Sequence, residues 1–186
     1  MHSRPTTMFI LTTLMFLPDF VAMAGTAKNC RVTFATKGQP VLVKIEGKSD
    51  EPCTGSFTTT SGELGSATFK MKLTAIDTGI ALRNKHLREN YLHTDKHPEA
   101  EIRITKLTDL KGKLDGSSNA KSAFEGTLNL HGVEKPIREG QYSIEGKGVT
   151  AEFCIDLPDH DVEKPAFMGV KIVDKVYVTV KFEMGE

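Results

Sequence analysis

The sequence predicts an all-β domain in which antiparallel strands close into a barrel, with a short helix inserted near residues 80–92. Three observations lead to this fold class. Apolar and polar residues alternate with period two from Cys30 onward, turn-like segments such as "LDGSS" and "IEGKG" separate the alternating runs, and one stretch at 80–92 breaks the alternation. A sheet with one apolar face must bury it by closing on itself or by packing on a second sheet, so a sandwich is the second arrangement considered.

The first 24 residues have the pattern of a cleavable secretory signal peptide. Arg4 gives the positive start, 8–17 is an apolar run too short to span a bilayer, and Ala22 and Ala24 form a small-x-small cleavage site. An uncleaved membrane anchor is the alternative, but "PD" at 18–19 interrupts the apolar run. We therefore expect cleavage after Ala24, leaving a single periplasmic or secreted domain at 25–186 with no transmembrane segment.

Charge and cysteine content narrow the class of partner and the compartment. The chain has 24 basic and 24 acidic side chains, which disfavours nucleic acid or an anionic surface as a partner and favours a small or apolar ligand. Cys30, Cys53 and Cys154 would meet an oxidising compartment after export. A Cys30–Cys53 disulfide and three unpaired thiols both fit the sequence, because connectivity does not follow from spacing.

The strands are expected wherever the alternation is sustained. In chain order the runs are 31–36, 41–47, 65–73, 99–107, 122–130, 149–157 and 175–184. Eight or nine strands in the mature chain suit a barrel, which leaves no exposed edge. One apolar face of these strands would line the interior. Its candidate ligand contacts are Phe69, Met71, Leu73, Ile102, Ile104, Phe124, Leu128, Phe153, Ile155, Val178, Val180 and Phe182.

The segment "IALRNKHLRENYL" at 80–92 is predicted to be a short helix, because its apolar residues do not alternate and it follows a turn-like "DTG". A helix inserted between two strands is placed to cap one end of a barrel.

The histidines around this helix raise the possibility of a metal or redox site. His86, His93 and His97 would share one face of a continuous helix and could hold zinc or copper. Pro98 disfavours helical geometry at His97, and no HExxH motif is present, so no metal site is assigned. No GxSxG motif or cysteine–histidine pair indicates a nucleophile either, and we expect no catalysis.

Three motifs in order resemble the YceI-like family of exported polyisoprenoid-binding proteins. They are "RNKHLRENYLHTDKHPEAEI" at 83–102, "HGVEKP" at 131–136 within "FEGTLNLHGVEKPI", and "FMGVKIVDKVYVTVKFEM" at 167–184. The resemblance runs from about Val41 to the C-terminus. It implies a lipocalin-like barrel with a helix near one end and an elongated apolar channel for an isoprenoid, an isoprenoid quinone or a fatty acid, without a further cofactor.

The affinity of such a ligand is expected to come from its tail. Burying about ten methylenes at ~0.8 kcal/mol each contributes roughly 8 kcal/mol before the cost of association, whereas an exposed charge pair contributes about 1 kcal/mol at most. Polar residues at the mouth would tune the choice of headgroup. The candidates are Arg83, Lys85, His86, Arg88 and His131. A filled barrel without a lipid ligand is the third reading, and a homodimer is left open.

Overall fold

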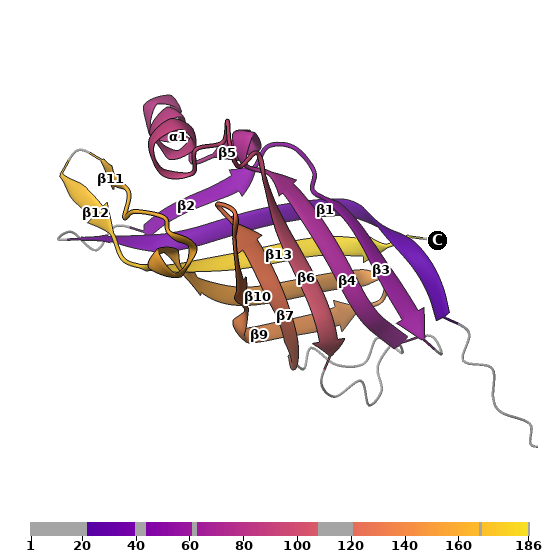
Figure 1. Cartoon of the computed structure of the whole chain (residues 1–186). Coiled ribbons are helices and arrows are strands. Elements are labelled where there is room, and N and C mark those ends of the chain that lie inside the picture. The colour runs from indigo at the N-terminus through magenta and orange to yellow at the C-terminus, as the bar shows by residue number, and fades with distance from the viewer. Residues whose placement is uncertain (1–21, 40–43, 61–62, 108–120, 168, 186) are drawn as a thin grey trace, which may run out of the picture.

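The computed structural model describes residues 22–39, 44–60, 63–107, 121–167 and 169–185. Eight of the described strands form a closed antiparallel ring, which confirms the predicted barrel (Figure 1). In their order around the ring they are β1 (Ala22–Gln39), β13 (Lys175–Met184), β10 (Gly148–Asp156), β9 (Arg138–Glu145), β7 (Ser122–Leu130), β6 (Glu99–Leu107), β4 (Glu63–Lys72) and β3 (Thr54–Thr60). Strand β1 closes the ring because it pairs with both β13 and β3.

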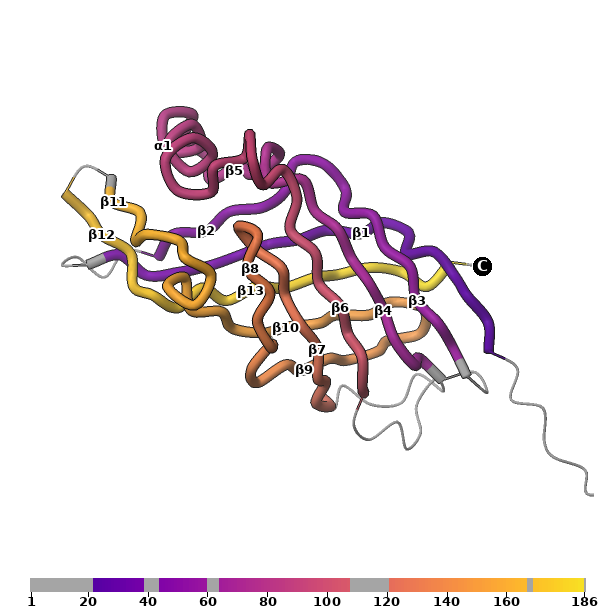
Figure 2. The backbone as a smooth tube through the Cα atoms, in the orientation of Figure 1, coloured from indigo at the N-terminus to yellow at the C-terminus, as the bar shows by residue number. Residues whose placement is uncertain are grey.

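One end of the barrel is extended by short strands, as the backbone trace in Figure 2 shows. They are β2 (Lys44–Ser49), β5 (Ile76–Asp77), β11 (Ala166–Phe167) and β12 (Val170–Ile172), while β8 (Val133–Pro136) pairs with β7. The extension depends on the length of β1, whose last residues pair with β2 and β12 after its first residues have paired with β3. The ring therefore flares at this end into a longer wall.

The alternation predicted from the sequence is the burial pattern of the strands. In β6, Ala100, Ile102 and Ile104 are buried, whereas Arg103 and Thr105 are exposed. The bounds of β6, β7 and β13 are those of the predicted runs 99–107, 122–130 and 175–184. Val41 and Val43 of the predicted run 41–47 lie outside the described residues, and β2 begins at Lys44.

The predicted helix near residues 80–92 is present at the flared end of the barrel (Figure 1). It consists of α1 (Ala81–His86) and a π-helical turn, η2 (Leu87–Tyr91). Two short 3₁₀ helices, η1 (Leu73–Ala75) and η3 (Leu157–His160), follow β4 and β10. Among the described helices, none combines the length and apolarity needed to cross a bilayer.

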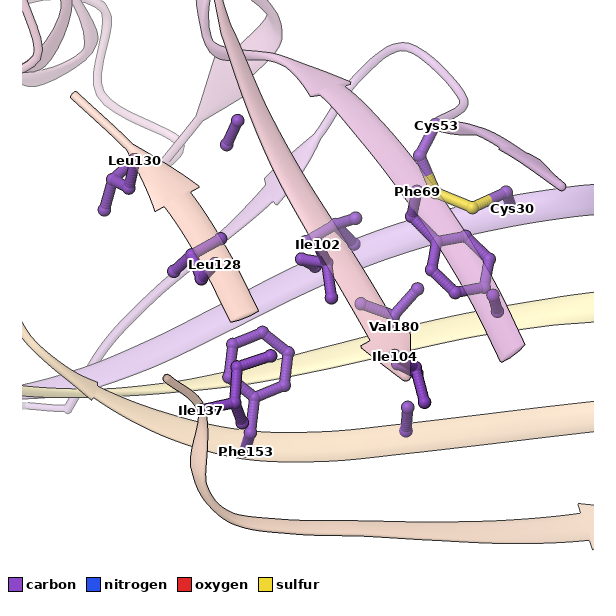
Figure 3. Close-up of a cluster of buried hydrophobic side chains, with 14 of the residues drawn as sticks. Cys30, Cys53, Phe69, Ile102, Ile104, Leu128, Leu130, Ile137, Phe153 and Val180 are labelled. Atoms are coloured by element: carbon purple, nitrogen blue, oxygen red, sulfur yellow. A yellow bond between two sulfur atoms is a disulfide. The ribbon is translucent and has the colours of Figure 1, made fainter. Parts of the chain in front are cut away.

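Aromatic rings pack the barrel interior near its middle. We call this layer the aromatic floor, and its members are Phe57, Phe69, Phe124, Phe153 and Phe182, all less than 7 % exposed. The ring centroids of Phe69 and Phe182 are 4.7 Å apart, and Phe124 meets Phe153 edge to face at 6.3 Å. Figure 3 shows Phe69 and Phe153 among the aliphatic side chains of this core. These ring contacts join strands that are not neighbours in the ring.

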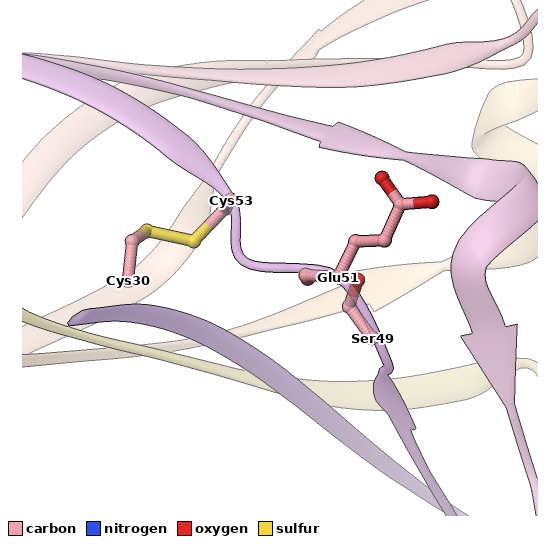
Figure 4. Close-up of a disulfide and its surroundings, with 4 residues drawn as sticks. All are labelled: Cys30, Ser49, Glu51 and Cys53. Atoms are coloured by element: carbon pink, nitrogen blue, oxygen red, sulfur yellow. Dashed lines mark hydrogen bonds between the residues drawn. A yellow bond between two sulfur atoms is a disulfide. The ribbon is translucent and has the colours of Figure 1, made fainter.

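Cys30 and Cys53 form a disulfide with a Cα–Cα distance of 5.1 Å (Figure 4). Cys30 lies in a bulge of β1, where the register with β13 shifts between Lys28 and Arg31. The backbone N–H of Cys53 also donates to the carbonyl of Cys30 at 3.1 Å. Cys154 is a free, half-buried thiol, and burial raises its pKa. The disulfide ties the start of β3 to the middle of β1.

Most of the predicted signal peptide, residues 1–21, lies outside the described residues. Its last three residues, Ala22, Met23 and Ala24, are exposed and pair with Thr58, Thr59 and Thr60 at the end of β3. Cleavage after Ala24 would shorten β1 at this end and leave its pairing from Gly25 onward. The leader and the compartment stay predictions.

His160 in η3 is the most buried of the polar side chains in the described core, at 3 % exposed. Its Nδ1 donates to the carbonyl of Val133 at 3.0 Å, which fastens η3 to β8. Burial lowers the pKa of His160 from its ordinary 6.5, because desolvation of the imidazolium outweighs the hydrogen bond that favours it.

We expect the stabilisation from neutral His160 to be fully present above pH 6.5 and to be lost as the pH falls toward the lower pKa of the folded state. In this window the unfolded chain binds a proton that the folded chain does not. Denaturant unfolding between pH 7.5 and 5 would show a smaller slope of unfolding free energy against pH in a His160→Gln variant. Because the comparison uses this slope and not the absolute free energy of unfolding, a general destabilisation of the variant does not affect the test. An unchanged slope would contradict this assignment.

Candidate functional site

The barrel encloses a cavity of about 390 Å³ at its flared end. This volume is within the range of about 300–1,000 Å³ of small-molecule sites in proteins. Ile80, which precedes α1, and Ala166, in β11, line the cavity and are also exposed, so the cavity opens to solvent at these residues. Figure 1 shows α1 and the β11–β12 hairpin at this end of the barrel. The described lining is mostly hydrocarbon, and its other members are Thr36, Cys53, Lys70, Thr78, Arg83, His86 and Tyr91. The barrel is therefore not filled by its own side chains at this end.

Eight of the twelve predicted ligand contacts lie on the cavity wall. They are Phe69, Met71, Leu73, Ile102, Leu128, Phe153, Ile155 and Val178. The other four, Ile104, Phe124, Val180 and Phe182, are outside the lining and belong to the solid core. The same alternation predicts all twelve as lining residues. For these four the prediction is wrong, because their position along the barrel places them in the core. Contact of the eight with a lipid stays a prediction.

The limit between cavity and core follows the strand registers. Phe69 pairs with Ile102, and Phe153 pairs with Val178, and all four side chains line the cavity. One inward position further along, Ala67 pairs with Ile104 and Ala151 with Val180, and none of these four lines it. Of the aromatic floor, Phe69 and Phe153 line the cavity, whereas Phe57, Phe124 and Phe182 do not, so the floor lies at the boundary between cavity and core.

The structure adds wall residues that the sequence did not indicate as ligand contacts. Those from barrel strands, β2 and η3 are Val32, Phe34, Ile45, Ala100, Leu130, Leu157 and Val176, and those from the mouth are Ile76, Ile80, Leu87, Tyr91, Leu92, Val162, Val170 and Ile172. Four of these residues belong to apolar faces that the alternation predicts: Val32, Phe34, Ala100 and Val176. The mouth residues come from the helical segment, from loops and from strands of two or three residues, which are too short to carry a period-two signal.

Tyr91 joins the two sides of the cavity mouth. Its hydroxyl accepts a hydrogen bond from the backbone N–H of Ala166 at 3.1 Å and donates to the carbonyl of Ala166 at 3.3 Å. Tyr91 is the last residue of η2, and Ala166 is the first residue of β11. The helical segment and the hairpin are thus linked across the opening.

Arg83 and His86 are the two predicted headgroup residues that line the cavity. Arg83 is half-buried, and its guanidinium donates through Nε to the hydroxyl of Thr78 at 2.8 Å and through Nη2 to the carbonyl of the same residue. His86 lies three residues further along α1 on the same helix face. Both side chains bring a polar group to an apolar wall.

A buried network fixes the residue that holds Arg83. The backbone N–H and the hydroxyl of Thr78 both donate to Oδ1 of Asn84, at 2.8 and 2.6 Å, and Asn84 Nδ2 donates to Asp77 Oδ1 at 2.8 Å. Thr78 and Asn84 are only 8 % and 9 % exposed. Hydrogen bonds from the backbone of Gly79 and then from Asn84 lower the pKa of Asp77, which keeps its carboxylate ionised.

The other predicted headgroup residues do not line the cavity. Lys85 is exposed, and its Nζ lies 3.9 Å from Oε2 of Glu89. Arg88 Nη1 donates a hydrogen bond to the carbonyl of Thr74 at 3.0 Å. His131 is in the turn between β7 and β8. Its Nε2 atom shares a hydrogen bond of 2.8 Å with the Nδ1 atom of His93. Gly132 has φ +79° and would place a Cβ 2.8 Å from the His97 ring, so the turn requires glycine there.

The structure separates the three histidines considered for a metal. His86 is on the cavity wall, whereas the His93 and His97 rings pack on His131, with centroids 5.1 and 4.6 Å from it. Within the described ranges, no group of three or more His, Cys, Asp or Glu side chains is arranged to hold a metal ion. The cluster therefore forms around His131 rather than along the helix.

A family model described as "YceI-like domain" matches residues 26–184. Curated relatives match a shorter segment. A UPF0312 protein of Photorhabdus laumondii is 40% identical over 68 residues, which are 36% of this chain and 31% of that protein. A UPF0312 protein of Vibrio campbellii is 40% identical over 65 residues, 34% of this chain and 31% of its own length. The matched segment thus spans about a third of these relatives.

Solved structures of low sequence identity share the fold. A polyisoprenoid-binding domain from Saccharophagus degradans has a TM-score of 0.61 at 17% identity, covering 87% of this chain and 98% of that one. BcnA of Burkholderia cenocepacia has a TM-score of 0.63 at 14% identity, covering 82% and 94%. The YceI protein of Campylobacter jejuni has a TM-score of 0.61 at 17% identity, covering 78% and 88%.

Proposed function

Because the chain belongs to the YceI-like domain family, in agreement with its sequence motifs, we propose that it is an exported protein that holds a long apolar lipid chain inside its barrel. We favour an isoprenoid or isoprenoid quinone as the ligand, and we propose that the protein carries or sequesters it. No catalytic step is part of the proposal. The single observation that carries it is the cavity of about 390 Å³ with a wall of hydrocarbon side chains.

The energetics of this wall favour a chain-like ligand. An empty apolar space lacks the dispersion contacts that a guest chain restores, and each methylene moved out of water contributes about 0.8 kcal/mol. Polar contacts at the exposed rim contribute less, because water and salt screen them. A ligand with a long tail therefore gains most of its affinity from the wall, and its polar end lies at the mouth beside Ile80 and Ala166.

The comparisons and the cysteines support the two halves of the proposal. The Saccharophagus degradans domain that shares this fold is described as polyisoprenoid binding. The predicted signal peptide and the Cys30–Cys53 disulfide are both typical of an exported chain, because disulfides persist in oxidising compartments. The metal and redox alternative has no corresponding cluster in the described part of the chain, so we do not carry it further.

The proposal is tested by native mass spectrometry of the untagged protein purified from its natural compartment, followed by lipid extraction. We expect about one bound isoprenoid-type lipid per chain. The mass of the polypeptide should be that of a chain that begins at Gly25. A delipidated sample should rebind an added long-chain isoprenoid alcohol. Recovery of apoprotein alone, together with failure to bind the added isoprenoid, would overturn lipid binding. A chain that retains residues 1–24 would overturn cleavage of the leader.

A further inference from the structure

We propose that Arg83 selects ligands whose apolar chain ends in an oxyanion, a carboxylate or a phosphate, over ligands that end in a neutral group. The inference rests on the proposed function and specifies the ligand class of the same cavity. It concerns one guanidinium, because the remaining described wall offers hydrocarbon, hydroxyl groups, the Cys53 sulfur, the His86 imidazole and the Lys70 ammonium, but no second arginine. Lys70 is also a wall residue, but its ammonium lies 3.3 Å from the Glu101 carboxylate.

Arg83 is held in place before any ligand arrives. Its Nε and Nη2 donate to the hydroxyl and the carbonyl of Thr78, so one edge of the guanidinium is occupied. A guanidinium has five N–H groups in a planar fork, and the remaining ones are available to a bidentate acceptor. Because Thr78 is itself fixed by buried Asn84, orienting the fork costs little entropy when a ligand binds.

The charge of Arg83 is not already neutralised by an ion pair. None of the ion pairs among the described residues includes Arg83, although its charge and that of Asp77 are close enough to interact. Oδ1 of Asp77 is occupied by hydrogen bonds from the Gly79 backbone and from Asn84. Arg83 therefore keeps a positive charge that faces an apolar space.

A ligand in the cavity changes the surroundings of this charge. Before binding, water at the mouth solvates the half-buried guanidinium. A bound tail displaces that water, and a cation that loses its water without gaining a partner is destabilised. An oxyanion supplies the partner, and a charge-assisted bidentate pair is stronger in these partly dry surroundings than in bulk water. A neutral end group cannot offset the same loss.

The test uses three ligands with the same tail: geranylgeraniol, geranylgeranyl phosphate and geranylgeranoic acid. Dissociation constants are measured by competition with a fluorescent polyene on the delipidated full-length mature chain. We expect at least one of the two oxyanions to bind about tenfold more tightly than the alcohol. The tighter of the two identifies the end group. In Arg83→Met, which keeps an apolar side chain of similar length, this preference should shrink to about twofold or less. The oxyanions should bind less tightly because they lose their partner, and the alcohol should not bind less tightly because no unpaired cation is desolvated.

Lys85→Met is the matched control, because it removes a cation two residues away on the same helix that does not line the cavity. It should keep the oxyanion preference. Equal binding of all three ligands by the unmodified protein would overturn the inference and leave the proposed function standing, whether or not Arg83→Met folds. A preference that survives in Arg83→Met would also overturn it. Failure of the unmodified protein to bind any of the three would instead count against the proposed function.

Discussion

An Ala100→Trp substitution is expected to weaken binding of an isoprenoid chain by about a hundredfold or more while the barrel still folds. Ala100 is an inward residue of β6, 8 % exposed, and it lies on the cavity wall beside its register partner Met71. An indole in this position takes the space of several methylenes of the guest. At about 0.8 kcal/mol for each, losing four of them costs roughly 3 kcal/mol, which is more than two orders of magnitude in affinity.

Ala123→Trp is the matched control for this experiment. Ala123 lies in β7, the strand that neighbours β6 in the ring, and its side chain is exposed on the outside of the barrel. The same substitution there should leave the dissociation constant within about threefold of the unmodified protein. Titration of both variants with a long-chain isoprenoid alcohol, with circular dichroism to verify the fold, makes the comparison. Similar losses in both variants would show that the chain does not bind where the cavity is.

Replacing both members of the disulfide, Cys30→Ala with Cys53→Ala, is expected to lower the free energy of unfolding by about 3 kcal/mol. The two cysteines are 23 residues apart, and the chain entropy released by opening a loop of that size accounts for this value. The two residues are 1 % and 5 % exposed, so alanine is better tolerated there than a polar residue. For a chain of this size the loss corresponds to a melting temperature lower by roughly 10 °C.

Denaturant unfolding with and without a reductant provides the measurement. The reductant should destabilise the unmodified protein by nearly the full amount and should leave the double variant unchanged. Cys154→Ala serves as the control, because that thiol is free and its removal opens no loop. If the reductant had no effect on the unmodified protein, or had the same effect on both proteins, the disulfide would not stabilise the fold as described.

The sequence predicted those strands whose inner and outer faces differ clearly. In β6, β7 and β13 the alternation is sustained for nine or ten residues, and their bounds were predicted correctly. Strand β3 was not predicted, because "TGSFTTT" has one large apolar residue, Phe57, in a run of small polar ones. Strand β9 was also not predicted. The inward-facing residue before Tyr142 is Gly140, which lies against Phe124 and has no apolar side chain to continue the alternation.

The candidate site could be predicted only in part from the sequence. Alternation says that Ile102 and Ile104 point to the same side, but it does not say that only Ile102 faces empty space. That distinction depends on Phe69 and Phe182, 110 or more residues apart in sequence, meeting across the barrel. The role of Thr78 in orienting Arg83 was also not predictable, because it depends on how α1 returns to the end of β5.

The aromatic floor separates the part of the barrel that keeps it folded from the part that faces a guest. Substitutions at wall residues such as Met71 or Ile155 alter the shape of a space that no protein atom fills. Their cost to folding is therefore small compared with that of changing Phe182, a ring of the floor that does not line the cavity. Under the proposed function, changes at the cavity wall would therefore alter which ligand fits before they altered the architecture.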